Sequence, residues 1–265
     1  MRADGALDVE ALLALALDAA QRAGRAISDR RGRPGRTEDK SSPTDPVTQA
    51  DRESDALIRE LLERRRPQDG LLSEEGPAHG RPSRSGLRWV VDALDGTVNY
   101  LYGIPQFAVS VAVEDEASGW GALVGVVHDP LRDESFTAIR DHGAWLNGRP
   151  LRIHDPVRLP KALVATEFSY RSASRRRQSA VVGRVLASAR DIRSTGSSAL
   201  DLCWTAAGRF DAFYEDELGR WDWAAGRLIV AEAHGVVTPL GSGVVAAGPA
   251  LHRELAPLLL SSGPP

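Results

Sequence analysis

The sequence has few of the residues that build sulfur-based and imidazole-based sites. Its 265 residues include one cysteine, Cys203, and six histidines. A single cysteine excludes a disulfide within the chain and a zinc site made of several cysteines. We expect Cys203 to be a buried, unreactive thiol, because it lies in the apolar run of residues 199–207. No two histidines have the spacing of a metal site or a catalytic triad, so we expect them to be structural or exposed.

Long apolar runs and a strong net charge are also missing. The longest apolar stretch begins at Ala11 and ends before Asp18, far short of the ~20 residues that a membrane helix needs. Acidic residues precede this stretch and no small-residue cleavage site follows, which is unlike a signal peptide. The net charge of −3 does not favour a nucleic-acid binder. We therefore expect a cytoplasmic protein with neither a nucleic acid nor a membrane as its partner.

Two common catalytic motifs are absent as well. No glycine-rich loop of the NTPase type is present, and neither Ser110 nor Ser169 stands in a nucleophile elbow. If the substrate of this acidic chain is an anion, a local positive charge must attract it. A bound metal ion is the usual source of that charge.

Apolar spacing predicts helices packed on sheets. The helices are expected near residues 8–29, 48–66, 174–189, 198–207, 222–234 and from 249 onward, and residues 30–46 form a loop or loose hairpin. Short strands in an antiparallel meander are expected near residues 71–73, 87–91, 107–113, 120–127, 135–139 and 162–166, and further strands near 190–193, 211–215 and 243–247. The prediction is a single domain over residues 1–265, with an N-terminal α+β half (about 1–155) and a C-terminal α/β half (about 156–265).

Two carboxylates end the apolar strand in the segment Trp-Val-Val-Asp-Ala-Leu-Asp-Gly-Thr, residues 89–97. Regular alternation would put Asp92 and Asp95 on opposite faces, so a turn must bring them together. Two adjacent anions need a cation, and hard oxygen ligands favour Mg²⁺, Mn²⁺ or Ca²⁺ over zinc. If Gly96 and Thr97 open a helix, their amides can bind phosphate oxygens. The structural alternative is an ordinary Asp-Gly turn.

Three further acidic positions also lie at expected element ends. Glu74 follows a short apolar run, Asp51 lies in the first turn of the second helix, and Asp222 opens a later helix. Each has a structural alternative, since acids at helix starts cap the helix or stabilise its dipole. Five acids at element ends, where loops gather into sites, favour a shared functional site.

Five segments together resemble the inositol monophosphatase family, within the Mg²⁺-dependent, Li⁺-sensitive sugar phosphatases. They are residues 40–51, 73–75, 89–99, 193–199 and 221–226, and the resemblance covers roughly residues 8–255. It implies a layered αβαβα sandwich, a homodimer, and two or three Mg²⁺ ions for which Mn²⁺ can substitute. Ala93 stands where most members have proline, and Ser73 where glycine is commoner; neither change removes a ligand.

The resemblance also implies metal-binding residues. Glu74, Asp92 and the backbone carbonyl of Leu94 resemble the ligands of a first metal ion. Asp92, Asp95 and Asp222 resemble the ligands of a second.

The same resemblance implies catalytic and substrate-binding residues. Asp51 and Thr97 resemble the pair that orients and deprotonates the attacking water, and Glu74 holds both a metal ion and a water. The amides of Gly96 and Thr97 resemble the phosphate site. Contacts to sugar-like hydroxyl groups are implied for Gly196, Ser197, Ser198, Glu215, Asp95 and Asp222.

The implied activity is hydrolysis of a small polyol or sugar phosphate, first of all inositol 1-phosphate. Histidinol phosphate and fructose 1,6-bisphosphate are alternative substrates, and a regulatory or binding protein that keeps the fold is an alternative of another class. The basic cluster around Arg171 and Arg175 is either a solvated helix start or a contact to a second phosphate. Lys40 is either a loop cation or an aid to phosphate binding.

Overall fold

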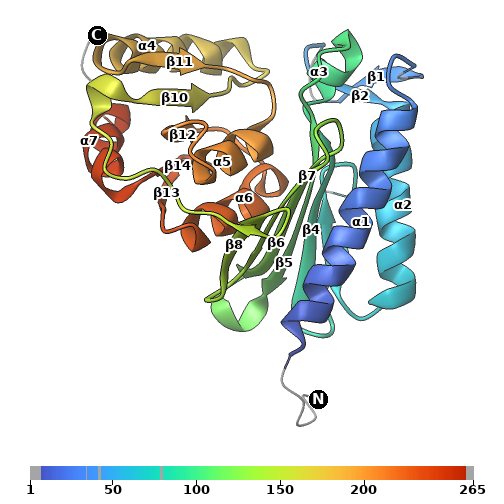
Figure 1. Cartoon of the computed structure of the whole chain (residues 1–265). Helices are drawn as coiled ribbons and strands as arrows, with labels where there is room; N and C mark the ends of the chain where they lie inside the picture. Colours follow the sequence, from blue (N-terminus) through green and yellow to red (C-terminus); the bar gives the residue numbers. More distant parts are fainter. Residues whose placement is uncertain (1–6, 34, 41–42, 78–79, 261–265) are drawn as a thin grey trace.

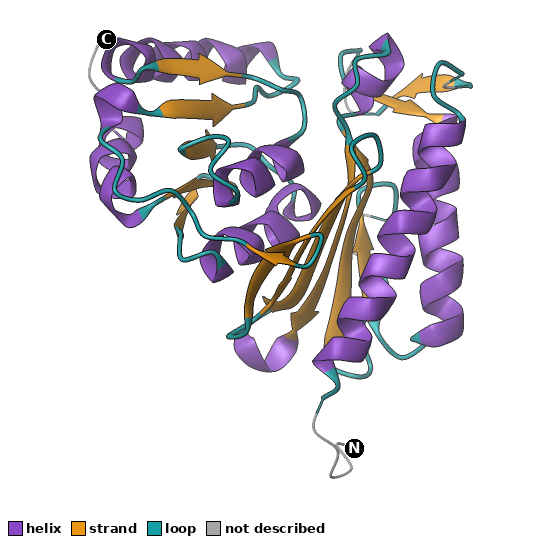
Figure 2. Ribbon diagram, in the orientation of Figure 1, coloured by secondary structure: helices purple, strands orange, loops and turns teal. Residues whose placement is uncertain are grey.

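Five alternating layers of helices and sheets build the molecule (Figures 1 and 2). The computed structural model describes residues 7–33, 35–40, 43–77 and 80–260. The outermost residues of the predicted domain, residues 1–6 and 261–265, and residues 41–42 of the first motif segment lie outside this description. The order of layers is a helix pair, a seven-stranded sheet, a second helix pair, a five-stranded sheet and a third helix pair. The predicted sandwich is confirmed.

The first helix pair is α1 (Val9–Asp29) and α2 (Gln49–Arg65). One apolar face of α1 is buried, and Asp8 caps the helix through the Ala11 amide. Thr48 and Asp51 form a reciprocal capping box that starts α2. Between the helices, β1 (Thr37–Asp39) and β2 (Pro46–Thr48) pair as the loose hairpin that the sequence allowed.

The seven-stranded sheet has the strand order β3-β4-β5-β6-β7-β8-β9. Its strands are β3 (Gly70–Ser73), β4 (Leu87–Asp95), β5 (Ala108–Asp115), β6 (Gly121–Asp129), β7 (Glu134–Ile139), β8 (Gly143–Leu146) and β9 (Arg149–Pro150). Strands β4 to β9 form the predicted antiparallel meander. The first and last strands expected in that series differ: β3 runs parallel to β4, and Leu163–Thr166 belongs to the other sheet. Helix α3 (Thr97–Tyr102) leaves the end of β4, and short 3-10 turns occupy Glu116–Ser118 and Leu159–Lys161.

The five-stranded sheet has the order β11-β10-β12-β14-β13. Its strands are β10 (Leu163–Thr166), β11 (Asp191–Arg193), β12 (Ala212–Glu215), β13 (Val236–Leu240) and β14 (Gly243–Ala247). Helices α5 (Ser198–Ala206) and α6 (Arg220–Glu232) lie between the two sheets, while α4 (Ser172–Ser188) and α7 (Pro249–Leu260) cover the outer face (Figure 1).

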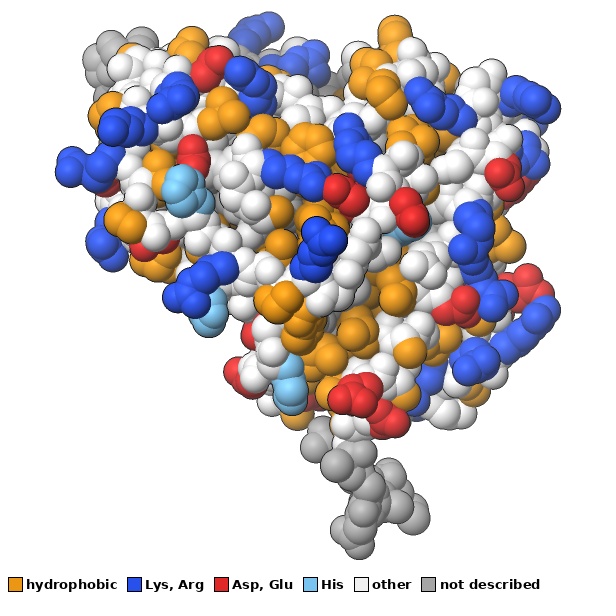
Figure 3. Space-filling model, viewed as in Figure 1, with side chains coloured by type: hydrophobic (Ala, Val, Ile, Leu, Met, Phe, Trp, Pro, Cys, Tyr) orange, Lys and Arg blue, Asp and Glu red, His pale blue; other side chains and the backbone are white. Residues whose placement is uncertain are grey.

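Both faces of the large sheet are buried, one by α1 and α2 and the other by α6. Strand β4 therefore reads as a nearly continuous apolar run: Trp89, Val90 and Val91 are at most 1% exposed. This packing holds the acidic end of β4 rigidly between the halves. Among the described residues, no helix is long and apolar enough to cross a membrane. Figure 3 shows basic, acidic and apolar side chains interspersed on one face of the molecule.

Candidate functional site

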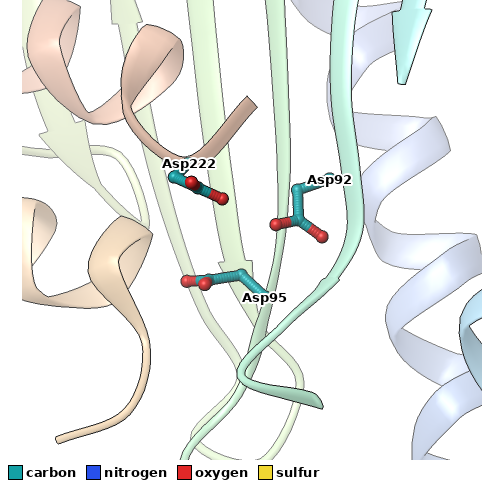
Figure 4. A group of neighbouring side chains, drawn as sticks. All are labelled: Asp92, Asp95 and Asp222. Carbon is teal, nitrogen blue, oxygen red and sulfur yellow. The ribbon is translucent and has the colours of Figure 1, made fainter. Parts of the chain in front are cut away.

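The end of β4 departs from regular pairing between the two aspartates. Asp92 lies opposite Ser110 on β5, whereas Asp95 lies opposite Ala108, so three steps on β4 match two on β5. The extra residue forms a bulge that bends the strand and changes the side-chain alternation. Both carboxylates consequently point to the same place (Figure 4). The turn expected from the sequence is thus a bulge inside the strand, which continues to Asp95 and does not end near Val91.

Asp222 joins this pair from the other half of the chain. It lies in the first turn of α6, where its carboxylate accepts a 2.7 Å hydrogen bond from the Gly219 amide. One oxygen from each of Asp92, Asp95 and Asp222 lies within 4.8 Å of the other two. Figure 4 shows the three side chains converging from strand β4 and helix α6.

Burial and mutual repulsion disfavour the ionised form of the carboxyl groups in this cluster. Burial is the main cause that raises the pKa of Asp92, and the charges of Glu74, Asp95 and Asp222 add to it. Burial also raises the pKa of Asp95 to about 7, although hydrogen bonds from Ser197 and Ala199 act in the opposite direction. A divalent cation would relieve this repulsion by replacing protons. The three carboxylates fit a hard ion such as Mg²⁺, since they offer only oxygen ligands.

Glu74 lies beside the cluster at the end of β3. Its carboxyl group is in hydrogen-bonding contact with that of Asp92. Lys40 Nζ lies 2.8 Å from Glu74 Oε1 and forms a second ion pair with Glu75. Burial by itself would lower the pKa of Lys40, but the two glutamates more than compensate and raise it. Lys40 therefore places a permanent positive charge next to the predicted metal ligands.

Asp51 and Thr97 are in direct contact, as the resemblance implies. Thr97 Oγ1 donates to Asp51 Oδ1 at 2.7 Å and lies 3.1 Å from the carbonyl oxygen of Leu94. The other Asp51 oxygen accepts from the Thr48 amide at 2.9 Å and from the Thr48 hydroxyl. Asp51 is thus both the helix cap of the structural interpretation and the partner of Thr97.

Gly96 connects β4 to α3 in a conformation that favours glycine, with φ of +97°. A Cβ at this position would lie 2.9 Å from the Gln106 carbonyl oxygen and 3.0 Å from that of Gly196. Both neighbours are backbone atoms and cannot swing away. Helix α3 begins at Thr97, so Gly96 and Thr97 stand at a helix start beside the carboxylates, as predicted.

The start of α5 supplies the remaining predicted residues. Ser197 is buried; its hydroxyl donates to Asp95 Oδ2, which also accepts from the Ala199 amide at 2.9 Å. Ser198 Oγ donates to Glu215 Oε2 at 3.2 Å. Ser197 therefore lies behind Asp95, whereas Ser198 and Glu215 line the cavity.

Most of these groups line one cavity with a volume of about 610 Å³, whereas Lys40, Asp51 and Ser197 lie behind its lining. Its acidic lining residues are Asp45, Glu74, Asp92, Asp95, Glu167, Glu215, Glu217 and Asp222, and its aromatic ones are Phe168, Tyr170 and Trp221. Arg171 is the basic side chain found in this lining among the described residues. An anionic substrate can approach this acidic lining only after cations have neutralised part of the negative charge of the lining.

The basic cluster near Arg171 is largely engaged by neighbouring groups. Arg175 donates to the carbonyl oxygens of Ser169 and Tyr170 at 2.9 and 2.7 Å. Arg177 pairs with Asp216 and Glu217. Only Arg171, 3.4 Å from Glu217, also reaches the cavity.

Other sequence expectations concern single residues. Cys203 is buried as expected, and burial raises the pKa of its thiol. His128 is buried and contacts Ser135. Glu167 lines the cavity but was not predicted; its position at the end of β10 is the same signal that identified Glu74.

A layered sandwich with clustered buried carboxylates is the architecture of the metal-dependent sugar phosphatases. Residues 8–260 match the inositol monophosphatase family, and the chain belongs to this family.

Individual relatives agree with this assignment. The chain is 42% identical over 215 residues to an inositol-1-monophosphatase of Rhizobium meliloti, covering 78% of this chain and 79% of the relative. It is 37% identical over 238 residues to the Nus factor SuhB of Salmonella typhimurium, covering 88% and 86%. The crystal structure of the extragenic suppressor protein SuhB from Bartonella henselae superposes with a TM-score of 0.87 at 35% identity, covering 96% of this chain and 100% of that one.

Proposed function

We propose that this protein is a Mg²⁺-dependent phosphomonoesterase that hydrolyses a small polyol or sugar phosphate, first of all inositol 1-phosphate. The observation that carries the proposal is the convergence of Asp92, Asp95 and Asp222 next to the Asp51–Thr97 pair. The proposed metal ligands and Thr97 of the water-activating pair then line one cavity. The relatives named inositol-1-monophosphatase support the choice of substrate.

Two or three Mg²⁺ ions, or Mn²⁺ as a substitute, fit the oxygen ligands. Glu74, Asp92 and the Leu94 carbonyl would hold one ion, and Asp92, Asp95 and Asp222 another. Bound ions of this kind neutralise the charge on the phosphoryl oxygens and lower the pKa of a coordinated water. Lys40 adds a fixed positive charge close to Glu74.

Asp51 and Thr97 would prepare the attacking water. Because Thr97 donates its proton to Asp51, its oxygen keeps lone pairs that can accept from a water molecule. As the water oxygen bonds to phosphorus, Thr97 accepts a proton from the water and passes its own to Asp51. The ester P–O bond breaks with its electron pair on the alkoxide oxygen, which takes a proton from solvent and leaves as the alcohol. Glu74 helps to orient this water. Every group in this relay is held by a helix cap or a strand end, so the geometry exists before the substrate binds.

The substrate would bind between the start of α3 and the start of α5. The Gly96 and Thr97 amides donate to the phosphate. Hydroxyl groups of the alcohol donate to Glu215 and to free oxygens of Asp95 and Asp222, and the turn at Gly196, Ser197 and Ser198 shapes this end of the cavity. A neutral polyol suits this end, since its hydroxyls satisfy carboxylates without adding negative charge.

Four substrates distinguish the proposed activity from its alternatives. Purified protein is incubated with inositol 1-phosphate, histidinol phosphate, fructose 1,6-bisphosphate and adenosine 3′,5′-bisphosphate, with and without Mg²⁺. We expect the fastest release of phosphate from inositol 1-phosphate, and only with Mg²⁺. A preference for histidinol phosphate or the fructose ester would change the proposed substrate but not the proposed reaction. No Mg²⁺-dependent release from any of the four would contradict the proposal.

The wider properties of the family belong to the same proposal. We propose a cytoplasmic homodimer that Li⁺ inhibits. The relative named Nus factor keeps open a binding role on the same fold. The set of candidate ligands favours hydrolysis, because a protein used only for binding does not need three converging carboxylates with a fourth, Glu74, beside them.

A further inference from the structure

The turn that joins β11 to α5 needs an external support. It carries Gly196, Ser197 and Ser198, the residues assigned above to the alcohol of the substrate. Gly196 has φ of +87° and is exposed, and Ser194 is exposed as well. The backbone amides of residues 194–197 are outside any helix or strand, so a partner elsewhere must hold them.

Glu167 provides that support from the end of β10. Its Oε1 accepts hydrogen bonds from the amides of Thr195, at 2.6 Å, and Gly196, at 2.5 Å. Its Oε2 accepts from the Ser194 hydroxyl at 2.8 Å. One carboxylate thus binds three successive residues of the turn, and hydrogen bonds to an ionised acceptor are the stronger kind.

Asp201 explains how Glu167 can stay ionised there. Asp201 is completely buried in the first turn of α5, and its Oδ1 accepts from Thr195 Oγ1 at 2.5 Å. Its Oδ2 is buried, receives no hydrogen bond, and has the carboxyl group of Glu167 as its neighbour. A proton on Asp201 satisfies both groups, since Asp201 then donates to Glu167. Burial first, and the charge of Glu167 second, raise the pKa of Asp201 accordingly.

The opposite side of the turn is fixed by the phosphate-binding half. Asn99 Nδ2 donates to the Thr195 carbonyl at 2.7 Å and to that of Gln106 at 2.8 Å. A Cβ on Gly196 would lie 2.4 Å from Asn99 Nδ2, so the contact is tight. The turn is therefore held between Asn99 on its carbonyl side and Glu167 on its amide side.

We propose that Glu167, hydrogen-bonded by a protonated Asp201, is a positioning residue that selects substrates whose alcohol carries several hydroxyl groups. It acts by fixing the turn of residues 194–198 against the cavity. This inference rests on the proposed phosphatase function. Glu167 takes no part in the attack on phosphorus, so it should affect binding of the alcohol more than the chemical step.

The test compares Glu167→Gln with the unaltered protein on two substrates. Inositol 1-phosphate uses the turn, whereas 4-nitrophenyl phosphate has no hydroxyls to place there. Glutamine keeps the size of the side chain, but its NH₂ group replaces one of the two acceptor oxygens. That NH₂ group would then face other hydrogen-bond donors. We expect KM for inositol 1-phosphate to rise at least about tenfold, the loss typical of a charge-assisted hydrogen bond. Turnover of 4-nitrophenyl phosphate should change less than about threefold. Equal losses on both substrates, or none, would overturn the inference.

Two variants serve as controls. Asp201→Asn keeps a donor toward Glu167, so we expect a KM close to that of the unaltered protein; a rise as large as that of Glu167→Gln would refute the protonated Asp201. Asp191→Asn removes a carboxylate on β11 whose hydrogen bonds are with Ile192 and Arg193, before the turn begins, and no change is expected.

Hydrogen exchange separates this inference from the proposed function. In Glu167→Gln, the amides of Thr195 and Gly196 should exchange at least about tenfold faster, while the amides of β12 keep their rates. Unchanged exchange would refute the support by Glu167, whatever the activity. If the unaltered protein hydrolyses neither substrate, the phosphatase proposal fails and so does the substrate-selecting role, whereas the exchange result still decides whether Glu167 holds the turn.

Discussion

At the scale of single residues, the carboxylates combine structural and chemical roles. Asp51 caps α2 and binds Thr97, and Asp95 accepts a hydrogen bond from the Ala199 amide in the first turn of α5 while it faces Asp92 and Asp222. The structural and functional interpretations of these acids are therefore compatible. A helix cap holds a carboxylate without consuming all of its lone pairs, so the free oxygens can serve a metal ion.

Replacing Asp95 by Asn tests the ligand role at constant shape. The amide keeps an oxygen for the Ser197 hydroxyl and the Ala199 amide but loses the negative charge. We expect kcat with inositol 1-phosphate to fall by about 100-fold or more, because metal sites depend strongly on each ligand. Thermal unfolding should show a folded protein whose Tm no longer rises with Mg²⁺. Near-normal turnover would contradict the assigned role.

Thr97 offers a matched pair of substitutions for the water-activating step. Thr97→Val keeps the shape but removes the hydroxyl that donates to Asp51, and Thr97→Ser keeps the hydroxyl. We expect kcat of the valine variant to fall by about 100-fold, the typical contribution of a positioned acid–base group. The serine variant should retain at least about a tenth of the activity. Similar kcat values for the two variants would show that the hydroxyl is not needed.

Most of this site could be predicted from residue types at element ends. Glu167 carries the same signal, but the contacts that it makes could not be predicted. Asp92, Asp95, Asp51, Glu74 and Asp222 each follow or open a strong apolar pattern. Glu167 also follows a strand, yet its partners are the Ser194 hydroxyl and the amides of Thr195 and Gly196, 27 or more positions later. Contacts that depend on such a distant turn leave no local pattern in the sequence.

At the scale of elements, long helices and buried strands were predicted, and several short elements were missed. Strands β8, β9 and β13 contain many partly or fully exposed residues, so they lack a clear apolar period. Helix α3 has only six residues and is too short for a helical period to show. The bulge in β4 was expected only as a turn, because pairing with β5 determines its form.

Two glycine substitutions test the connection between β4 and α3. Gly96 and Gly119 both have positive φ, so alanine costs about 1–2 kcal/mol of strain at either position. At Gly119 nothing lies within 4 Å of the new Cβ, whereas at Gly96 two backbone oxygens lie at 2.9 and 3.0 Å. We expect Gly96→Ala to lower the free energy of unfolding by about 1–3 kcal/mol more than Gly119→Ala.

Urea unfolding measures this difference, and phosphate release measures its consequence. Gly96→Ala should also lose activity, since the phosphate-binding amides shift, while Gly119→Ala should keep it. Equal stability losses would show that the close backbone approach at Gly96 has no cost.

At the scale of the whole molecule, the site exists because two sheets meet. Asp92 and Asp95 come from the seven-stranded sheet, and Asp222 comes from a helix between the sheets, 127 positions after Asp95 in the numbering. Hydrophobic patterning predicts the layers but not how the halves approach. The prediction that the acids of the two halves meet in one site depended on the family resemblance. The match to known structures confirms the fold.

The concentration of buried carboxylates predicts how stability depends on pH. The pKa of Asp95 is raised to about 7, while the same group in the unfolded chain titrates near pH 4. Between these values the folded protein without metal binds more protons than the unfolded chain, so its stability falls as the pH rises from about 4 through 7. The raised pKa values of Asp92 and Asp222 act in the same direction.

Mg²⁺ should offset this loss of stability at higher pH, because the ion takes the place of the protons on the carboxyl groups. We therefore expect the increase in Tm caused by Mg²⁺ to be small at pH 5 and larger at pH 8. Thermal unfolding with and without the ion at both pH values measures it. An increase that is independent of pH would mean that Mg²⁺ does not bind at these carboxylates.

The most direct test of the central claim is a Mg²⁺ titration of the chelator-treated protein. Phosphate release from inositol 1-phosphate is followed as the ion is restored. Our account predicts no release above background without Mg²⁺ and a saturable rise as it is added. Release at the full rate in the presence of chelator, or no release at any Mg²⁺ concentration, would contradict it.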